Sequence, residues 1–456
     1  MNALILSAVL GVIMMFSGIL LKQKSAVRGV AITGLAALLL VNILELRGIH
    51  FFKIDVAGMM YFDRFALLFV TIALFATLVY FILSARDMEK VGVDYAEYFA
   101  LIFFITCGII LVASFKSLLI LFLGIEIISI PLYILTGADK RNLKSNEGSL
   151  KYFLMGAFST GLMLMGIALI YGASGTFDVE KMKFAIETPA VLPVTGMLLL
   201  LFSMSFKVSA APFHFWTPDV YDGAPTVFTS FMATIVKAAV FIGFIRLFDE
   251  TFGTFQVKWQ MWIAVIAAVT LFIGNITAVF QQSVKRMLAY SSIAQAGFML
   301  LAIYSMNTSS KEGILLYSAA YSLATIGIFS VLNKLNDYTF EGFNGLAKQQ
   351  PVVAATLTIF LLSLAGIPLT AGFLAKFFML KSVIDTGSGL WLVIFAVLMA
   401  AVSVYYYFRV IQAMYFKEGK ADVAVTAPFK WALVLIAGLI ILLGTFPNIL
   451  INWFYF

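Results

Sequence analysis

The sequence predicts an all-α integral membrane protein with about fourteen transmembrane helices, and two observations support this fold class. Apolar residues make up 62% of the 456 residues and charged residues only 12%, whereas a soluble domain carries about 25% charged residues and is about half apolar. Apolar runs of about 20 residues, the length that crosses a bilayer core, recur along the whole chain. We therefore expect residues 1–456 to form a single membrane domain.

The apolar runs follow one another through connections that are mostly short. The first run has no basic segment before it and no small-residue cleavage site, so we expect a retained helix rather than a removed signal peptide. In chain order the fourteen runs lie at 2–21, 29–46, 64–84, 97–114, 117–136, 149–172, 190–210, 224–247, 260–280, 286–305, 312–333, 351–370, 389–416 and 429–448.

The chain has few residues that can hold a metal or an electron carrier. Cys107 is its single cysteine, and His50 and His214 are its two histidines. One cysteine can form neither an internal disulfide nor a four-cysteine cluster site. We therefore expect no cofactor and no metal in this chain, and no redox chemistry of its own.

The distribution of basic residues predicts an orientation. The formal charge is +7, but lysines and arginines are scattered among the connections rather than gathered on one face, so we expect no nucleic-acid partner. Connections after odd-numbered runs hold seventeen of them, and connections after even-numbered runs hold ten. Because cytoplasmic loops carry the excess of positive charge, we expect the odd loops in the cytoplasm and both termini outside.

Four charged residues lie within apolar stretches rather than between them: Glu126, Lys207, Lys237 and Lys376. One charge at the bilayer centre costs roughly 2.5–3.5 kcal/mol on insertion scales. Four of them cost on the order of 10 kcal/mol, which is comparable to the net stability of a folded domain. Charges retained against such a penalty indicate a function.

Two roles are open for these charges. One is structural, a buried Lys–Glu pair that fixes the register of two helices, but three lysines outnumber the one carboxylate. The other is proton transfer, because an amine held away from water gives up its proton readily and a nearby carboxylate favours the protonated form. Moving Glu126 closer to a lysine or away from it would then load or unload a proton. A carboxylate with hydroxyl neighbours could equally bind sodium, so the ion stays open.

Proline and glycine interrupt two of the predicted helices. The stretch 212–218 begins and ends with proline and follows Lys207, and Gly366-Ile367-Pro368 precedes Lys376. A proline frees backbone carbonyls, which a membrane tolerates only where protein or water satisfies them. Two broken helices at separated positions are typical of ion sites in transporters. We expect discontinuous helices at the seventh and twelfth runs.

Small polar residues and one histidine surround the charges. His214 lies at the seventh-run break, two helical turns from Lys207, where it could relay protons, although a lone histidine in an apolar run is more often a structural donor. Hydroxyls near the lysines could hold bridging waters, although such groups more often cap backbone carbonyls. These are Ser129, Ser209, Thr234, Tyr290, Ser291 and Ser292.

Runs 4–8 and 9–13 have matching layouts. The fourth run of each set is broken by proline, at Pro212 and Pro368, which lie 156 residues apart. Identity between the two sets is poor, so the expected repeat rests on the positions of these prolines. Two inverted five-helix repeats imply two half-channels that meet near the middle of the membrane. The expected parts are 1–95 with three spans, the repeats 96–248 and 259–416, and the last span at 429–456.

Four stretches of the sequence match the motifs of one family. Residues 206–225 read FKVSAAPFHFWTPDVYDGAP, Gly124-Ile125-Glu126 is followed by Pro131, residues 231–238 surround Lys237, and residues 372–377 end at Lys376-Phe377. Together they resemble the signature, the fifth-helix glutamate, the eighth-helix lysine and the broken twelfth helix of the antiporter-like membrane subunits of respiratory complex I. The likeness covers runs 3 to 13.

The resemblance implies roles for these residues. Glu126 tunes Lys207, and Lys237, with His214 as a possible helper, passes the proton toward Lys376 on the exit side. Lys151, in Ser149-Leu150-Lys151-Tyr152-Phe153, is similar to a further family lysine; the alternative is a lysine that extends its amine to cytoplasmic headgroups. The resemblance implies that a lysine at 376 occurs in two of the three kinds of antiporter-like subunit, and we expect no room for the long lateral helix that one of these two carries.

The resemblance also implies partners and a location. The neighbours are other membrane subunits of the complex, both antiporter-like and small ones, and the lipid bilayer of a bacterial inner membrane. NADH, FMN, iron–sulfur clusters and quinone belong to partner subunits. Two alternatives stay open: a subunit of a multisubunit cation/proton antiporter, which shares the Glu–Lys arrangement, and a membrane scaffold that transports nothing.

Overall fold

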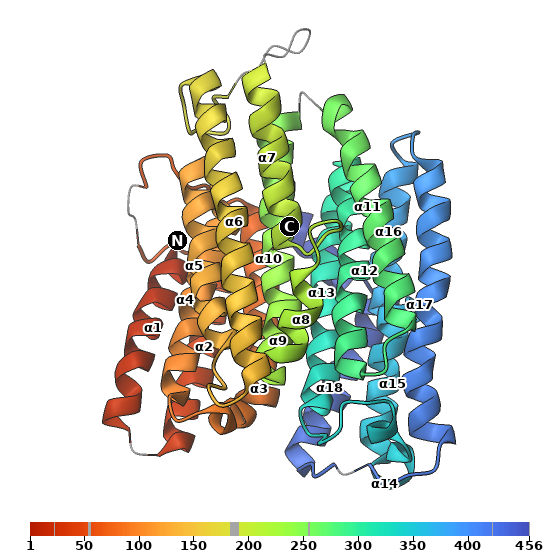
Figure 1. The fold of residues 1–456 in the computed structure, drawn as a ribbon. Coiled ribbons are helices and arrows are strands. Elements are labelled where there is room, and N and C mark those ends of the chain that lie inside the picture. Colours follow the sequence, from red (N-terminus) through yellow and green to blue (C-terminus); the bar gives the residue numbers. More distant parts are fainter. Residues whose placement is uncertain (22, 53–55, 183–190, 254–255, 422, 456) are drawn as a thin grey trace.

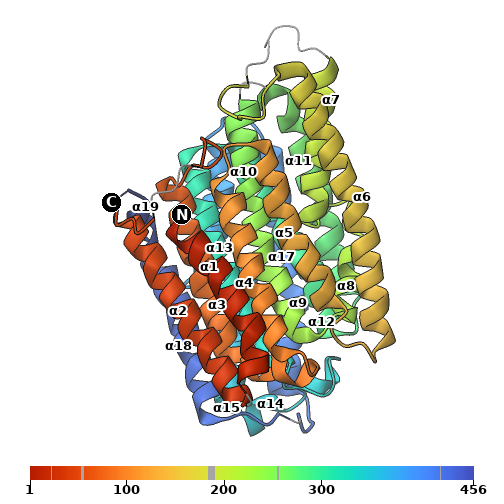
Figure 2. The same cartoon turned by 90° about the vertical axis from the view of Figure 1, so that its left-hand side faces the viewer.

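The computed structural model describes the chain apart from residues 22, 53–55, 183–190, 254–255, 422 and 456. The regular elements of this described part are helices, and only three isolated bridges join extended residues. Most helices run side by side along one common direction (Figures 1 and 2). Twelve of them are long and apolar enough to cross a membrane, and two further spans are broken into shorter helices. The all-α membrane fold of about fourteen spans is thus confirmed.

The helices follow the predicted order of runs. They are α1 (Asn2–Leu20), α2 (Lys24–Leu46), α3 (Arg64–Val91), α4 (Tyr95–Ser114), α5 (Leu118–Thr136), α6 (Leu143–Ser174), α7 (Val191–Lys207), α8 (Trp216–Gly223), α9 (Thr226–Phe231), η1 (Met232–Val236), α10 (Lys237–Phe252), α11 (Gln256–Val279), α12 (Val284–Ser305), α13 (Thr308–Leu332), η3 (Glu341–Phe343), α14 (Leu346–Gln349), α15 (Pro351–Ala365), α16 (Ala371–Ile384), α17 (Leu390–Phe416), α18 (Ala427–Thr445) and α19 (Asn448–Tyr455).

Two predicted spans are longer than their apolar runs. The seventh run was expected to end at residue 210, but the span continues through α8, and the twelfth, expected to end at 370, continues through α16. In both cases the chain breaks its helix and resumes in nearly the same direction, as α7 with α8 and α15 with α16 show (Figure 1). An apolar count stops at the polar and proline residues of such a break, although the backbone goes on through the membrane.

The most buried helices lie at the centre of the bundle. The apolar segments of α13 and of α9–η1–α10 are completely buried and that of α12 nearly so, whereas those of α1, α2, α17 and α18 are less than half buried. Figure 2 shows α1 and α2 at the outside of the bundle. The outer helices therefore present apolar side chains to lipid, while the central ones carry polar groups among protein atoms.

Both breaks use unusual backbone conformations whose polar groups find local partners. Ser209 has φ +64° at the first break, and Gly366 and Leu369 have φ +85° and +71° at the second. The amide of Ala211 donates to Thr270 Oγ1 at 2.9 Å, and the amide of Gly372 donates to Ser363 Oγ at 3.1 Å. The discontinuous seventh and twelfth helices are confirmed; the limits of the two repeats stay a prediction.

Candidate functional site

The first buried charge pair joins α5 to α7. Lys207 Nζ lies 3.9 Å from Glu126 Oε1, with 7% and 22% of the two side chains exposed. The amine donates instead to Ser129 Oγ at 3.0 Å and to Thr160 Oγ1 at 3.3 Å, while Thr160 donates to Glu126 at 2.8 Å. A hydroxyl thus bridges amine and carboxylate, so the carboxylate acts on the amine without a direct hydrogen bond.

Lys207 is also the last residue of α7. The carbonyl end of a helix carries a partial negative charge, which favours a cation there. The first break therefore serves two purposes: it ends the helix inside the protein, and it provides an electrostatic environment for an amine far from water.

Lys237 follows directly after the π-helical turn η1. Turns of this kind are rare and are frequent at functional sites, because the extra residue redirects the side chains around it. Only 2% of Lys237 is exposed. Its amine donates to both the carbonyl and the hydroxyl of Ser292 at 3.0 Å, and it lies 5.8 Å from the ring centre of Tyr221. In the described part of the chain no carboxylate pairs with it.

Lys376 belongs to α16, but its amine returns to the end of α15. It donates to the carbonyls of Leu364 at 2.8 Å and Ala365 at 3.0 Å, and lies 4.6 Å from the ring centre of Phe298. A Cβ at Gly366 would lie 2.9 Å from Lys376 Cδ, and the φ of +85° also requires glycine. The second break is therefore built around the lysine side chain.

Polar side chains that the sequence did not single out continue beyond Lys376. Gln295 donates to the same Leu364 carbonyl at 3.0 Å and to the Tyr407 hydroxyl at 3.1 Å, and it accepts from Tyr317. Tyr407 in turn shares a hydrogen bond with Ser291, one of the predicted hydroxyls. Next to them is a cavity of about 10 Å³, lined by Gln295 and Lys376. That is about the space one water needs.

Hydroxyl-bearing side chains lie in the stretches between the three lysines. Ser209, two residues after Lys207, neighbours Tyr221, whose ring faces Lys237. Tyr321 neighbours Ser292, the partner of Lys237, and also lines the small cavity at Lys376.

Neither the Ser209 nor the Tyr321 hydroxyl has a hydrogen-bond partner of good geometry among the described residues. Buried hydroxyls without partners are uncommon, and they are the places where a water can be accommodated. Of the other predicted hydroxyls, Thr234 only caps its own helix, by donating to Ser230 O at 2.6 Å.

His214 lies inside the first break, buried and stacked on Phe215 at 4.6 Å between ring centres. Its Nδ1 has no hydrogen-bond partner among the described residues. No hydrogen bond or ion pair of the described structure joins it to Lys207 either, so the geometry favours neither the relay role nor the structural one.

Lys151 lies apart from the row of buried amines. Its side chain is half-exposed and forms ion pairs with Glu147 at 2.6 Å and Asp219 at 2.9 Å, while Asp219 also binds Arg286 at 3.0 Å. These residues line a cleft of about 190 Å³. The cleft lies where α6, α8 and α12 meet, at the end of the bundle that carries the connections after odd-numbered spans, which we call the odd-loop end.

Four further charges are buried, although we did not expect them within the membrane from the sequence; two of them, Lys285 and Arg246, were counted with the loops. Lys285 donates to the carbonyls of Asp222 at 2.8 Å and Ala224 at 2.7 Å, and Arg246 pairs with Asp63 at 3.0 Å. Glu45 binds the terminal amine of Met1, and Asp87 binds Lys334 at 2.5 Å. All four are nearly unexposed. Each lies near the end of a helix, where sequence alone cannot distinguish a solvated charge from one covered by a neighbouring segment.

The fold and the row of buried amines define a class, the polytopic membrane proteins with discontinuous helices that surround intramembrane charges. Residues 116–445 match the family described as NADH:quinone oxidoreductase/Mrp antiporter, TM. The chain belongs to this family. The resemblance to antiporter-like subunits of complex I is confirmed.

Individual relatives define the kind of subunit. NADH-quinone oxidoreductase subunit N of Cytophaga hutchinsonii is 40% identical over 464 residues, with 99% of each chain covered. A chain of respiratory complex I from Thermus thermophilus is 31% identical with a TM-score of 0.85, over 99% of this chain and 98% of that one. A chain of the Mrp complex from Dietzia sp. has a TM-score of 0.86 over 99% and 96%, but at 17% identity it shows a shared fold alone. Subunit N is one of the two kinds of antiporter-like subunit to which Lys376 pointed, and the one that the sequence favoured.

Proposed function

We propose that this chain is the N subunit of a bacterial NADH-quinone oxidoreductase and carries protons across the membrane through Glu126, Lys207, Lys237 and Lys376. One observation carries the proposal: three buried amines follow one another from the first break to the second, held by hydroxyls and carbonyls rather than by tight ion pairs. A tight pair would fix the charge of an amine, whereas neutral partners let it gain or lose a proton.

The contacts support a division of work along the row. Glu126 acts on Lys207 through Thr160, so a small movement of α5 against α7 changes how strongly the amine holds its proton. Lys237 and Lys376 donate only to uncharged acceptors. Whether each amine is protonated therefore depends on whether the neighbouring amines of the row carry a proton. Waters at the unpaired hydroxyls of Ser209 and Tyr321 would complete the connections between the amines.

The direction of transfer rests on the proposed orientation. The odd-loop end faces the cytoplasm and both termini face the periplasm, in the inner membrane of a bacterium. The cleft at Lys151 and Asp219 then takes up protons from the cytoplasm, and Lys376 delivers them toward the far side. Partner subunits hold NADH, FMN, the iron–sulfur clusters and the quinone, and movements at the contacts with the other membrane subunits drive the transfer.

Single alanine variants of the assembled complex test the proposal. Glu126→Ala, Lys207→Ala and Lys376→Ala are each expected to leave assembly intact while proton pumping and the coupled quinone reduction are lost or much reduced. The measurement is proton uptake into vesicles that contain the reconstituted complex, normalised to the amount of assembled complex. Lys381→Ala is a matched control, because it removes an exposed lysine from the same helix as Lys376.

The same measurement distinguishes the alternatives. A scaffold subunit predicts less assembled complex but unchanged pumping per complex. Unchanged pumping per complex in all three variants would contradict proton transfer through this chain. An antiporter subunit, or a sodium site at Glu126, predicts that pumping depends on sodium in the medium. We expect the same rate in sodium-free potassium buffer.

A further inference from the structure

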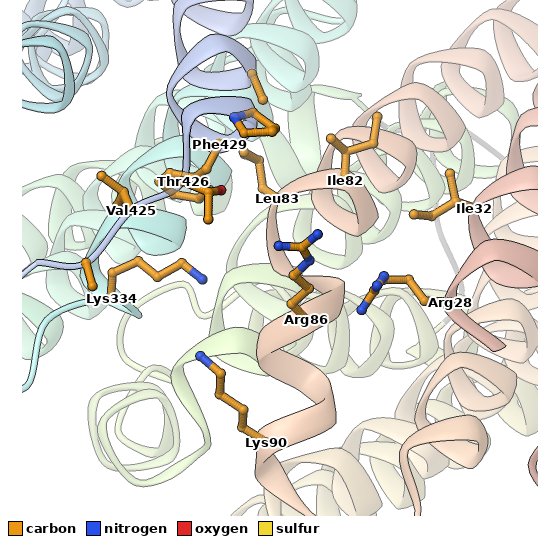
Figure 3. A pocket seen from close by; sticks show the side chains of 13 residues that line it. Arg28, Ile32, Ile82, Leu83, Arg86, Lys90, Lys334, Val425, Thr426 and Phe429 are labelled. Carbon is orange, nitrogen blue, oxygen red and sulfur yellow. The ribbon is translucent and has the colours of Figure 1, made fainter. Parts of the chain in front are cut away.

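A basic cleft of about 400 Å³ opens at the odd-loop end, between α2, α3 and α18. Four basic side chains line it, Arg28, Arg86, Lys90 and Lys334, and no acidic side chain does so among the described residues. Figure 3 shows the charged ends of these side chains turned toward a common space. This cleft is separate from the row of buried amines and takes no part in the proposed proton transfer.

The cleft keeps an excess of positive charge after its ion pairs are formed. Arg28 pairs with Glu89 at 2.7 Å, and Lys90 and Lys334 share Asp87 at 3.0 and 2.5 Å. Arg86 makes no ion pair or hydrogen bond to any residue that the structure describes. Two carboxylates therefore face four cations, and an unpaired guanidinium is the group best suited to grip a phosphate with two parallel hydrogen bonds.

Helix α18 adds to the positive potential. Its N-cap, Thr426, lines the cleft but gives no side-chain hydrogen bond to the helix, and Pro428 follows in the first turn. The free amides of a first helical turn and the positive end of the helix dipole attract anions. Side chains and backbone thus favour the same kind of ligand.

Between the basic side chains the walls of the cleft are apolar, which favours a ligand that also has an apolar part. Ile32, Ile82 and Phe429 line it, and Ile82 is 55% exposed although it lies one turn from Arg86. A strongly charged mouth above exposed aliphatic side chains, between transmembrane helices at the proposed cytoplasmic end, is the arrangement that binds anionic lipid headgroups.

A second cavity lies on the same face in the other half of the bundle, where α19 also lines it. It measures about 370 Å³, is lined almost wholly by apolar side chains, and lies against the same helices α3 and α18, with Phe75 and Leu439 in its wall. Phe75 precedes Ile82 by seven residues, and Leu439 follows Ala432 of the basic cleft by seven. Seven residues are two helical turns, or roughly 10 Å along the same face of each helix. From Arg86 to Phe75 the helix rises eleven residues, or roughly 16 Å, so an acyl chain that spans one leaflet, whose hydrocarbon is about 15 Å thick, ends at the near edge of this cavity.

We propose that the α3–α18 face binds one anionic phospholipid, with its phosphate at Arg86, Lys90 and the start of α18 and an acyl chain directed toward the apolar cavity. The lipid fills the cleft and stabilises the contact between the N-terminal spans and the last span. Its binding does not depend on proton transfer, so it can be tested separately.

Photo-crosslinking of lipid to the intact complex tests this site. The complex is reconstituted in phosphatidylcholine vesicles that contain a small fraction of photoactivatable phosphatidylglycerol, and crosslinked peptides of α3 and α18 are quantified by mass spectrometry. The variant Arg86→Gln/Lys90→Gln removes two charges but leaves the pairs of Arg28 and Lys334 in place. We expect the apparent affinity at these peptides to fall about thirty-fold, as the loss of two basic groups implies.

The control variant is Lys417→Gln/Lys420→Gln, which removes two exposed lysines from the same end of the bundle. It is expected to keep the crosslinks, and equal loss in both variants would reduce the effect to general surface charge and overturn the site. Competition by inorganic phosphate as effective as that by unlabelled phosphatidylglycerol would identify a soluble anion instead of a lipid.

A comparison without variants covers the case in which the cleft variant fails to assemble. In the unmodified complex, phosphatidylglycerol is expected to label α3 and α18 at least ten times as strongly as phosphatidylcholine with the same reactive group. Equal labelling would contradict a headgroup-specific site. No labelling by either lipid would show that another part of the complex, such as an acidic segment of a neighbouring subunit, covers the cleft.

Discussion

The two broken helices hold their lysines in different ways. At the first break Lys207 is the last residue of its half-helix and has Glu126 at 3.9 Å, with hydroxyls between them. At the second break Lys376 lies on the second half-helix and reaches back to the carbonyls of Leu364 and Ala365 on the first. The Lys207 amine donates to hydroxyls of other helices and the Lys376 amine to carbonyls of its own broken span, and among the described residues only Lys207 has a carboxylate nearby.

This difference separates a site that can be adjusted from a site that is fixed. The electrostatic interaction of Lys207 with Glu126 varies with the distance between α5 and α7. At 3.9 Å between Nζ and Oε1 it favours the protonated amine, but no direct hydrogen bond fixes the two groups at that distance. The partners of Lys376 are backbone carbonyls of one short break, which move together with it. Movements of neighbouring subunits are thus expected to act on the row of buried amines at its Glu126 end.

The largest expected effect concerns the carboxylate that only the first break has. Lys207→Met leaves a partly buried Glu126 without a cation and should lower the free energy of unfolding by about 2–3 kcal/mol. Adding Glu126→Gln should recover most of that loss, whereas it should recover nothing in Lys376→Met. Thermal unfolding of the purified complex, followed through this subunit, measures both combinations. Equal recovery in the two backgrounds would remove the distinction between the breaks.

A smaller effect is expected from the backbone of the second break. Gly366→Ala places a methyl group 2.9 Å from Lys376 Cδ at a φ of +85°, so the variant should be destabilised by about 2 kcal/mol, and the displaced amine should also slow pumping. Gly438→Ala is the matched control, since nothing lies within 4 Å of the added carbon there and the helix should be stabilised slightly. Similar melting temperatures for the two variants would contradict the tight fit around Lys376.

The adjustable character of the first break predicts a partial defect in Glu126→Gln. The amide oxygen can still accept from Thr160, but it has no charge to act on Lys207, so pumping should fall about tenfold without loss of assembly. Proton uptake per quinone reduced measures the effect, and Glu418→Gln, at an exposed site, is the control. Pumping at the normal rate would show that the Lys207 proton does not depend on the carboxylate.

The smallest effect concerns the strain at the first break. Ser209 has φ +64°, and its hydroxyl has no hydrogen-bond partner among the described residues, so Ser209→Gly should raise the free energy of unfolding by up to about 1 kcal/mol. If the hydroxyl holds a water between Lys207 and Lys237, the same variant should pump more slowly despite its greater stability. A melting temperature below that of the unmodified protein would show that the hydroxyl is needed for packing.

The sequence was sufficient for the fold class, the two breaks and the charges within spans, because each depends on local patterns of apolar residues, proline and lysine. It was insufficient where burial depends on distant segments. Arg246 was counted with the loops, yet it is covered by the carbonyls of Ala113 and Phe115 and pairs with Asp63, far away in the chain. No window of residues around Arg246 contains that information.

The polar cluster next to Lys376 was missed for a related reason. Tyr317 and Tyr407 count as apolar in a search for spans, and a lone Gln295 within a run changes the average little. Their hydroxyl and amide groups become significant only when α12, α13 and α17 bring them together. Glutamine and tyrosine at the same membrane depth as Lys376, on neighbouring helices, would have been a useful signal. The depth of each residue and the order of neighbouring helices are known only once the fold is known.

The complete burial of the central helices has a consequence for how the protein is made. Helix α12 is the least apolar of the twelve long spans and carries Ser291, Ser292 and Gln295, all unexposed in the final fold. A segment like this gains little by entering lipid alone, so it is expected to wait beside the translocon until α13 can shield its polar groups. The polar residues along the proposed proton path are therefore also expected to set the order in which the helices enter the membrane.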